Sequence, residues 1–84
     1  MGSITKTSYG IDCKRMGSLY ASALVSNASA KVEALPELQK HPKYIKLHDA
    51  EKQAVQGIIC RMAGSMLLAA GYKSELVNQI MDGK

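Results

Sequence analysis

The sequence has no tryptophan and no phenylalanine among its 84 residues. A hydrophobic core must therefore be built from Ala, Leu, Met, Ile and Val, which bury less surface per side chain than aromatic residues. In so short a chain, a core of this kind supplies only about 3–5 kcal/mol of stability. We therefore expect one helical domain over residues 1–84 that is marginal as a monomer and gains stability by self-association.

Signatures of several other protein classes are also missing. Cys13 and Cys60 stand far apart, which excludes a disulfide-rich scaffold and favours a reducing, cytoplasmic setting. Neither histidine has metal-ligand spacing, so no metal and no other cofactor is expected. Residues 1–10 lack the apolar core of a signal peptide, and neither uncharged stretch of the chain is apolar enough to predict a membrane span. Because the sequence lacks paired carboxylates, a glycine-rich phosphate loop and an oriented nucleophile, we predict a protein that is not an enzyme.

The net charge of +4 comes from a thin excess of basic residues spread along the whole chain. A nucleic-acid-binding protein usually concentrates lysine and arginine on one face, because each phosphate contact needs its own cation. Weak nucleic-acid binding is therefore the third of the functional hypotheses that the sequence supports.

The first half of the sequence predicts a leader, one long helix and a connector. Residues 1–10 are predicted to form a loose leader, and Asp12 is a suitable N-cap for a long helix that follows it. This helix is expected to run to about Leu35, because Pro36 cannot continue it. Residues 36–48 hold both prolines of the chain and are predicted to form a connector with one short helical turn.

Two more helices are predicted after the connector. Asp49 can cap a second long helix that ends at Gly71, a residue suited to a left-handed conformation. Ser74 can then cap a short third helix that ends at Gly83. No alternating run of β-branched residues predicts a strand. We expect an all-α fold in which two long helices form an antiparallel hairpin, a short C-terminal helix packs across it, and copies of the chain complete the structure.

The two long helices lack the charged face that a helix normally turns to water. Residues 16–30 contain no charged side chain, and residues 53–72 contain only Arg61. Gly57 and Gly64 stand seven residues apart, so they share one side of the helix. Small residues in such a row allow two helices to approach closely. The predicted oligomer interface consists of these glycines and an adjacent apolar row: Gly57, Gly64, Ile59, Met62 and Met66.

Arg61 has three competing interpretations. Its side chain can extend to water while its aliphatic part covers apolar surface. It can pair with a carboxylate of another helix or another chain, such as Asp12, Glu33 or Glu75. It can also be the anion-binding group of a pocket at a helix interface, where a planar guanidinium suits a phosphate.

These features lead to two functional hypotheses ahead of nucleic-acid binding. In the first, a homo-oligomeric helical protein captures a small anionic, nucleotide-like ligand. Arg61 would bind its phosphate, the serines of the first helix would donate hydroxyls, and the connector would close the rim. The predicted ligand-binding residues are Arg61, Ser22, Ser26, Lys43, Tyr44 and Lys46. In the second, the chain is an interaction module or inhibitor that binds a partner protein through an uncharged helix face. A compact helical chain that needs copies of itself is similar in style to small accessory proteins of phages.

Overall fold

The computed structural model describes residues 10–82, and its regular elements in this range are helices and one 3₁₀ turn. These elements are α1 (Cys13–Ser26), the short 3₁₀ turn η1 (Val32–Ala34), α2 (Pro36–Gln39), α3 (Pro42–Ile45), α4 (Asp49–Ala69) and α5 (Ser74–Asp82). Residues 10–82 contain no β-strand, so the predicted all-α class is confirmed for this part of the chain. The predicted leader, apart from Gly10, and the predicted end of the last helix at Gly83 lie outside the described residues.

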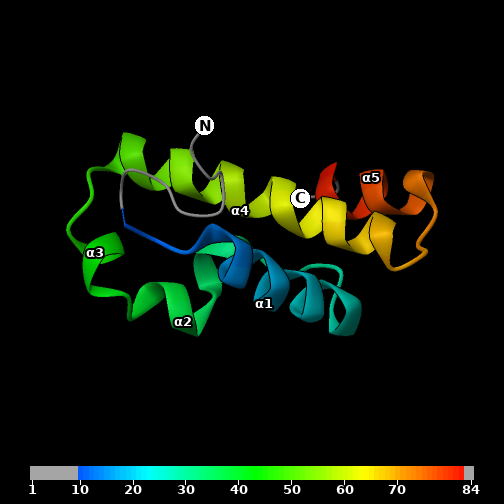
Figure 1. Cartoon of the computed structure of the whole chain (residues 1–84), viewed down its shortest axis with the longest axis horizontal. Coiled ribbons are helices and arrows are strands. Elements are labelled where there is room, and N and C mark those ends of the chain that lie inside the picture. Colours follow the sequence, from blue (N-terminus) through cyan, green and yellow to red (C-terminus); the bar gives the residue numbers. More distant parts are fainter. Residues whose placement is uncertain (1–9, 83–84) are drawn as a thin grey trace.

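The core lies where α1 packs against α4, which agrees with the predicted pairing of the two long helices. Figure 1 shows α3 near the beginning of α4 and α5 beside its end. Every buried residue of α4 is four residues from the next buried one, so they form a single apolar stripe. The buried residues of these two helices are Cys13, Met16, Gly17, Tyr20, Ala21 and Leu24 from α1 and Val55, Ile59, Ala63 and Leu67 from α4.

Close approach of α1 and α4 depends on Gly17. A Cβ atom built at this position would lie 2.5 Å from Met62 Cβ and 3.3 Å from the backbone nitrogen of Ala63. Both of these atoms are fixed by the helix backbone, so they cannot move aside as the end of a flexible side chain can. The absence of a side chain at Gly17 therefore sets the distance between the two central helices.

The first helix ends at Ser26, so the predicted end near Leu35 is wrong. Asn27 adopts an extended conformation, and its side-chain oxygen accepts a hydrogen bond of 3.0 Å from the Ser29 backbone N–H. Such a local bond offers the backbone an alternative to the next helical turn. The Tyr20 hydroxyl donates to the Ala30 carbonyl at 3.1 Å and thereby ties the departing chain back to α1.

The connector is more ordered than the sequence predicts, because it holds two short helices instead of one turn. Each of these helices has a proline in its first turn, Pro36 in α2 and Pro42 in α3. Proline suits this place because a first-turn N–H has no partner within the helix. Leu38 and Tyr44 then turn inward and join the core, so the connector covers one end of the α1–α4 pair.

The ends of α4 follow the capping rules, with a shift of one residue at the start. His48 is the N-cap, so Asp49 is the first helical residue and not the predicted cap, and the Glu51 carboxylate accepts from the His48 N–H at 2.9 Å. At the other end Gly71 has a φ of +102°, as predicted. The Gly71 N–H donates to Leu68 and the Tyr72 N–H donates to Leu67, which completes a Schellman motif.

The start of α5 is also one residue away from its prediction. Ser74 is the first helical residue and not the cap, because the first backbone bond of this helix runs from the Val77 N–H to the Lys73 carbonyl at 3.0 Å. Val77 is buried, whereas Ile80 and Met81 are half-buried. This apolar side holds α5 against the second half of α4.

Candidate functional site

A groove of about 430 Å³ runs between α4 and α5. Its floor is open because Gly64 has no side chain. A Cβ atom at Gly64 would lie 3.9 Å from Val77 Cγ1 and 4.0 Å from Met81 Cγ. The residues that line the groove are Cys60, Arg61, Gly64, Ser65 and Leu68 from α4 and Val77, Asn78 and Met81 from α5. The groove therefore has a mixed lining, in which one cation, one hydroxyl and one amide stand among apolar side chains.

Among the described side chains that line this groove, Arg61 is the one that carries a charge. It is exposed, and within residues 10–81 no carboxylate forms an ion pair with its guanidinium. The predicted intramolecular pairing with Asp12, Glu33 or Glu75 does not occur in this structure of the single chain. The Asp12 carboxylate instead accepts from the Arg15 N–H at 3.2 Å and caps α1. Arg61 thus offers its hydrogen-bond donors to whatever enters the groove.

The other predicted ligand-binding residues do not line the groove of Arg61. Ser22 and Ser26 are exposed on α1, and Lys43 and Lys46 belong to the region of α3. Figure 1 shows α3 and α5 at opposite ends of α4. The sequence could not reveal that Lys43 and Lys46 lie far from Arg61. Their distance from the groove results from the way the connector folds over the beginning of α4.

Tyr44 packs inside the chain instead of presenting a free ring. It is 6% exposed, and its hydroxyl accepts a hydrogen bond of 2.7 Å from Gln56 Nε2. The ammonium group of Lys52 lies 5.4 Å from the centre of its ring, a cation–π distance. Tyr44 therefore fastens α3 to α4, and its ring has little surface left on which a ligand could stack.

The five predicted interface residues differ in burial. Ile59 is fully buried in the core, and Met62 and Met66 are half-buried on the same helix. Gly64 faces α5 of its own chain, whereas a Cβ atom at Gly57 would meet nothing within 4 Å. Of the five residues, Gly57 is the one that is classed as exposed.

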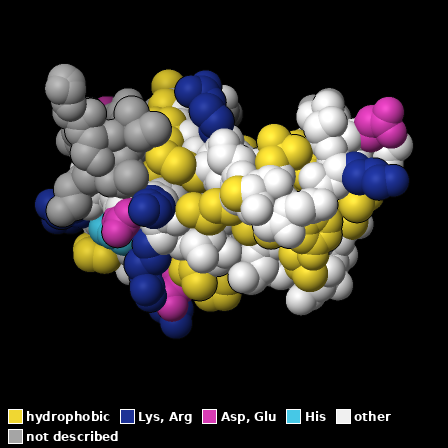
Figure 2. Space-filling view, turned by 45° about the vertical axis from the view of Figure 1, so that its right-hand side comes forward, with side chains coloured by type: hydrophobic (Ala, Val, Ile, Leu, Met, Phe, Trp, Pro, Cys, Tyr) yellow, Lys and Arg dark blue, Asp and Glu magenta, His cyan; other side chains and the backbone are white. Residues whose placement is uncertain are grey.

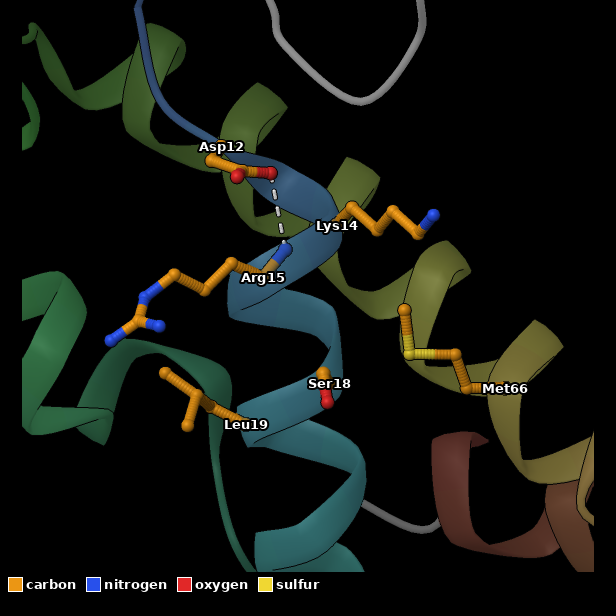
Figure 3. Close-up of a pocket in the computed structure, with 6 residues that line it drawn as sticks. All are labelled: Asp12, Lys14, Arg15, Ser18, Leu19 and Met66. Carbon is orange, nitrogen blue, oxygen red and sulfur yellow. Dashed lines mark hydrogen bonds between the residues drawn. The ribbon is translucent and has the colours of Figure 1, made fainter.

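A second hollow, of about 400 Å³, lies beside the beginning of α1 (Figure 3). Its basic residues do not converge. In Figure 3 the Arg15 guanidinium points away from Lys14 and Met66, and it pairs with Glu37 at 3.8 Å. An anion in this hollow would meet one lysine beside the Asp12 carboxylate. The α4–α5 groove, whose described lining residues include no carboxylate, is the better anion site.

Ser65 and Asn78 are polar groups of the groove that sequence reasoning missed. Both are exposed and uncharged, and neither stands in a recognisable motif. The helical spacing of Ser65 from Arg61, four residues, was the one signal available for it. Asn78 comes from another helix, so only the packing of α5 brings it to this place.

Among the described side chains, no group of three or more His, Cys, Asp or Glu residues is placed to hold a metal ion. None of the described helices combines the length and hydropathy needed to cross a bilayer. Comparison with protein-family models, curated proteins and solved structures gives no match to this chain.

Proposed function

We propose that this chain is a non-enzymatic, cytoplasmic binding protein that captures a small anionic ligand in the α4–α5 groove. The observation that carries the proposal is the position of Arg61, which is the one charged group, with no carboxylate beside it, among the described residues that line the groove. A volume of about 430 Å³ falls within the range of small-molecule sites, about 300–1,000 Å³. A ligand of this size that has one anionic end and a body with both polar and apolar groups fits this lining.

A nucleotide has the required combination of groups. A planar guanidinium binds two phosphate oxygens at once, which an ammonium cannot do. The hydroxyl of Ser65 and the amide of Asn78 supply hydrogen-bonding groups for a sugar or base, and Leu68 and Met81 offer apolar surface for a ring. Inorganic phosphate would use Arg61 alone and leave the apolar part of the groove unfilled.

Substitution of Arg61 by lysine tests this proposal while preserving the charge. We expect nucleotide affinity to fall by roughly tenfold to a hundredfold, which corresponds to about 1.5–3 kcal/mol for one charge-assisted contact. Isothermal titration with AMP, ADP and GMP, supported by thermal shifts with the same compounds, measures the change. Lys46→Gln is the matched control, because Lys46 is an exposed cation outside the groove. Equal affinity of the wild-type and Arg61→Lys proteins would remove Arg61 from the site.

Exposed leucines favour a second candidate function, binding of a partner protein. Leu68 is 48% exposed and Leu76 is 44% exposed. Large exposed apolar side chains close to a groove are typical of protein interfaces. A partner whose binding is lost with Leu76→Gln and unchanged with Arg61→Lys would favour this candidate over ligand capture. Duplex DNA in the thermal-shift panel tests the third hypothesis, weak nucleic-acid binding.

A further inference from the structure

The helix α5 is held in place by little packing. Among its described side chains, those of residues 74–81, Val77 is the one that is buried, whereas Ile80 and Met81 are half-buried. By contrast, six residues of α1 and four of α4 are buried. Within the described part of the chain, no backbone hydrogen bond joins α5 to another helix. The docked position of α5, packed against α4, therefore depends mainly on three side chains.

A helix as short as α5 needs its packing to stay folded. It has nine residues, and isolated helices shorter than about 12–15 residues are marginal in water. In the view of Figure 1, α5 lies on the side of α4 opposite α1, so its detachment leaves the α1–α4 pairing in place. Elements with few buried contacts open at a lower free-energy cost than the core of the same protein. Detachment of α5 is therefore a local opening that costs less than global unfolding.

Gly64 leaves the docking of α5 weaker than this position of α4 allows. A Cβ atom at Gly64 would lie 3.9 Å from Val77 Cγ1 and 4.0 Å from Met81 Cγ, which are ordinary van der Waals distances. An alanine would thus fit and would add contacts with α5. It would also favour the helical conformation of α4 more than glycine does. Glycine at this position therefore keeps α5 less firmly docked than alanine would.

The groove has one wall from each helix, so a ligand bound in it contacts both. Arg61 and Ser65 line it from α4, and Asn78 and Met81 line it from α5. Only the α4 wall remains when α5 detaches. A ligand that contacts both walls therefore binds the docked state more tightly than the open state. By linkage, such a ligand shifts the population toward the docked state.

We propose that α5 is a ligand-operated flap, which detaches from α4 in a fraction of the ligand-free molecules and is held in place by the bound anion. This inference rests on the proposed function, because the ligand is the one captured beside Arg61. It adds regulation to that function, since detachment exposes the apolar side chains of Val77, Ile80 and Met81. Occupancy of the groove is thereby converted into a change of the protein surface.

Hydrogen–deuterium exchange of the full chain, followed by mass spectrometry, tests this proposal with ADP as the probe. Without ADP, the backbone amides of α5 should exchange about tenfold faster, or more, than those at the centre of α1. With ADP at about a hundred times its dissociation constant, exchange of α5 should slow by up to about a hundredfold. Exchange of α2 and α3 through their own local opening should not change, because the groove lies at the other end of α4.

Two variants shift the docking of α5 in opposite directions. Ile80→Ala removes a half-buried side chain that does not line the groove. Exchange of α5 should become faster, and ADP affinity should fall by roughly threefold to tenfold because fewer molecules are docked. Gly64→Ala should slow the exchange of α5 in the absence of ADP. Gln79→Ala, which introduces alanine at an exposed position of α5, is the control and should exchange no faster than the wild type. Circular dichroism checks that the variants are folded.

Two results would overturn the inference, and they differ for the proposed function. If ADP binds in an Arg61-dependent way and the exchange of α5 is the same with and without it, the flap is wrong and the proposed function stands. If calorimetry detects no binding of ADP, AMP or GMP, the ligand control of α5 and the proposed function are both wrong, whatever the exchange rate of α5.

Discussion

Single residues in this protein have roles that their type does not reveal. Gly17 and Gly57 are both glycines inside long helices, but only Gly17 has a neighbour that excludes a side chain. Tyr44 looks like a surface aromatic among lysines, but its hydroxyl is bonded to Gln56 and its ring is buried. Each role depends on which element lies opposite, which a local sequence window does not contain.

The Gly17→Ala variant should be clearly less stable than the wild type. Its new methyl group would lie 2.5 Å from Met62 Cβ, so α1 and α4 would have to move apart. Overpacking of this kind destabilises a protein by about 1–3 kcal/mol. Urea denaturation followed by circular dichroism measures the change. Ser18→Ala, at the next and exposed position, is the control and should leave stability nearly unchanged.

At the scale of elements, a helix end can be predicted from the sequence where a suitable capping residue marks it, and not where no such residue is present. The end of α4, two residues before Gly71, was predictable, because glycine is the residue type that tolerates a positive φ best. The end of α1 at Ser26 was not, because no proline or glycine marks it. The bonds of Asn27 and Tyr20 stop this helix nine residues before the expected end near Leu35.

Two glycine-to-alanine substitutions in and after α4 should have opposite effects. Gly71→Ala forces an L-residue to a φ of +102° and should lower the free energy of unfolding by about 1–2 kcal/mol. Gly57→Ala removes a flexible residue from an uncrowded helical position and should raise it by about 0.5–1 kcal/mol. Both values come from urea titrations of dilute protein without anions. A loss of stability in Gly57→Ala under these conditions would show that this position is crowded within the monomer.

At the scale of the whole molecule, charged residues are distributed unevenly, with one region rich in them and another almost free of them. Residues 31–52, which include η1, α2, α3 and the start of α4, hold five lysines and four carboxylates. Residues 53–72 hold Arg61 alone. Figure 2 shows one face of the molecule, on which charged side chains lie toward the edges and the middle is largely uncharged. The charged region suits contact with water, and the uncharged region suits contact with a ligand or a second copy.

The stability of the whole molecule should fall in alkaline solution. Burial raises the pKa of the Cys13 thiol above its ordinary value of 9.0, and the neighbouring Asp12 carboxylate acts in the same direction. Burial also raises the pKa of the Tyr20 phenol above 10.0, with smaller contributions from Cys60 and Glu33. The unfolded chain therefore loses these protons at a lower pH than the folded chain. The free energy of unfolding is thus unaffected by these groups below their ordinary pKa values and decreases as pH rises above about 9.

Urea titrations at a series of pH values from about 7 to about 10.5 measure this decrease. In the double variant Cys13→Ala, Tyr20→Phe, the free energy of unfolding should decrease less steeply with pH than in the wild type, whatever the stability of the variant at neutral pH. A slope equal to that of the wild type would show that these two groups do not titrate differently in the folded chain.

The sequence by itself determined the helical class, the cap at Asp12, the left-handed residue at Gly71 and the absence of charge around Arg61. Each of these depends on a period or a cap within a few neighbouring residues, and local geometry decides it. Only the tertiary structure decided that Arg61 faces a groove with α5, that Lys43 and Lys46 lie apart from it, and that Gly17 is the crowded glycine. These depend on which helices meet, and that is set by burial of apolar faces from distant parts of the chain.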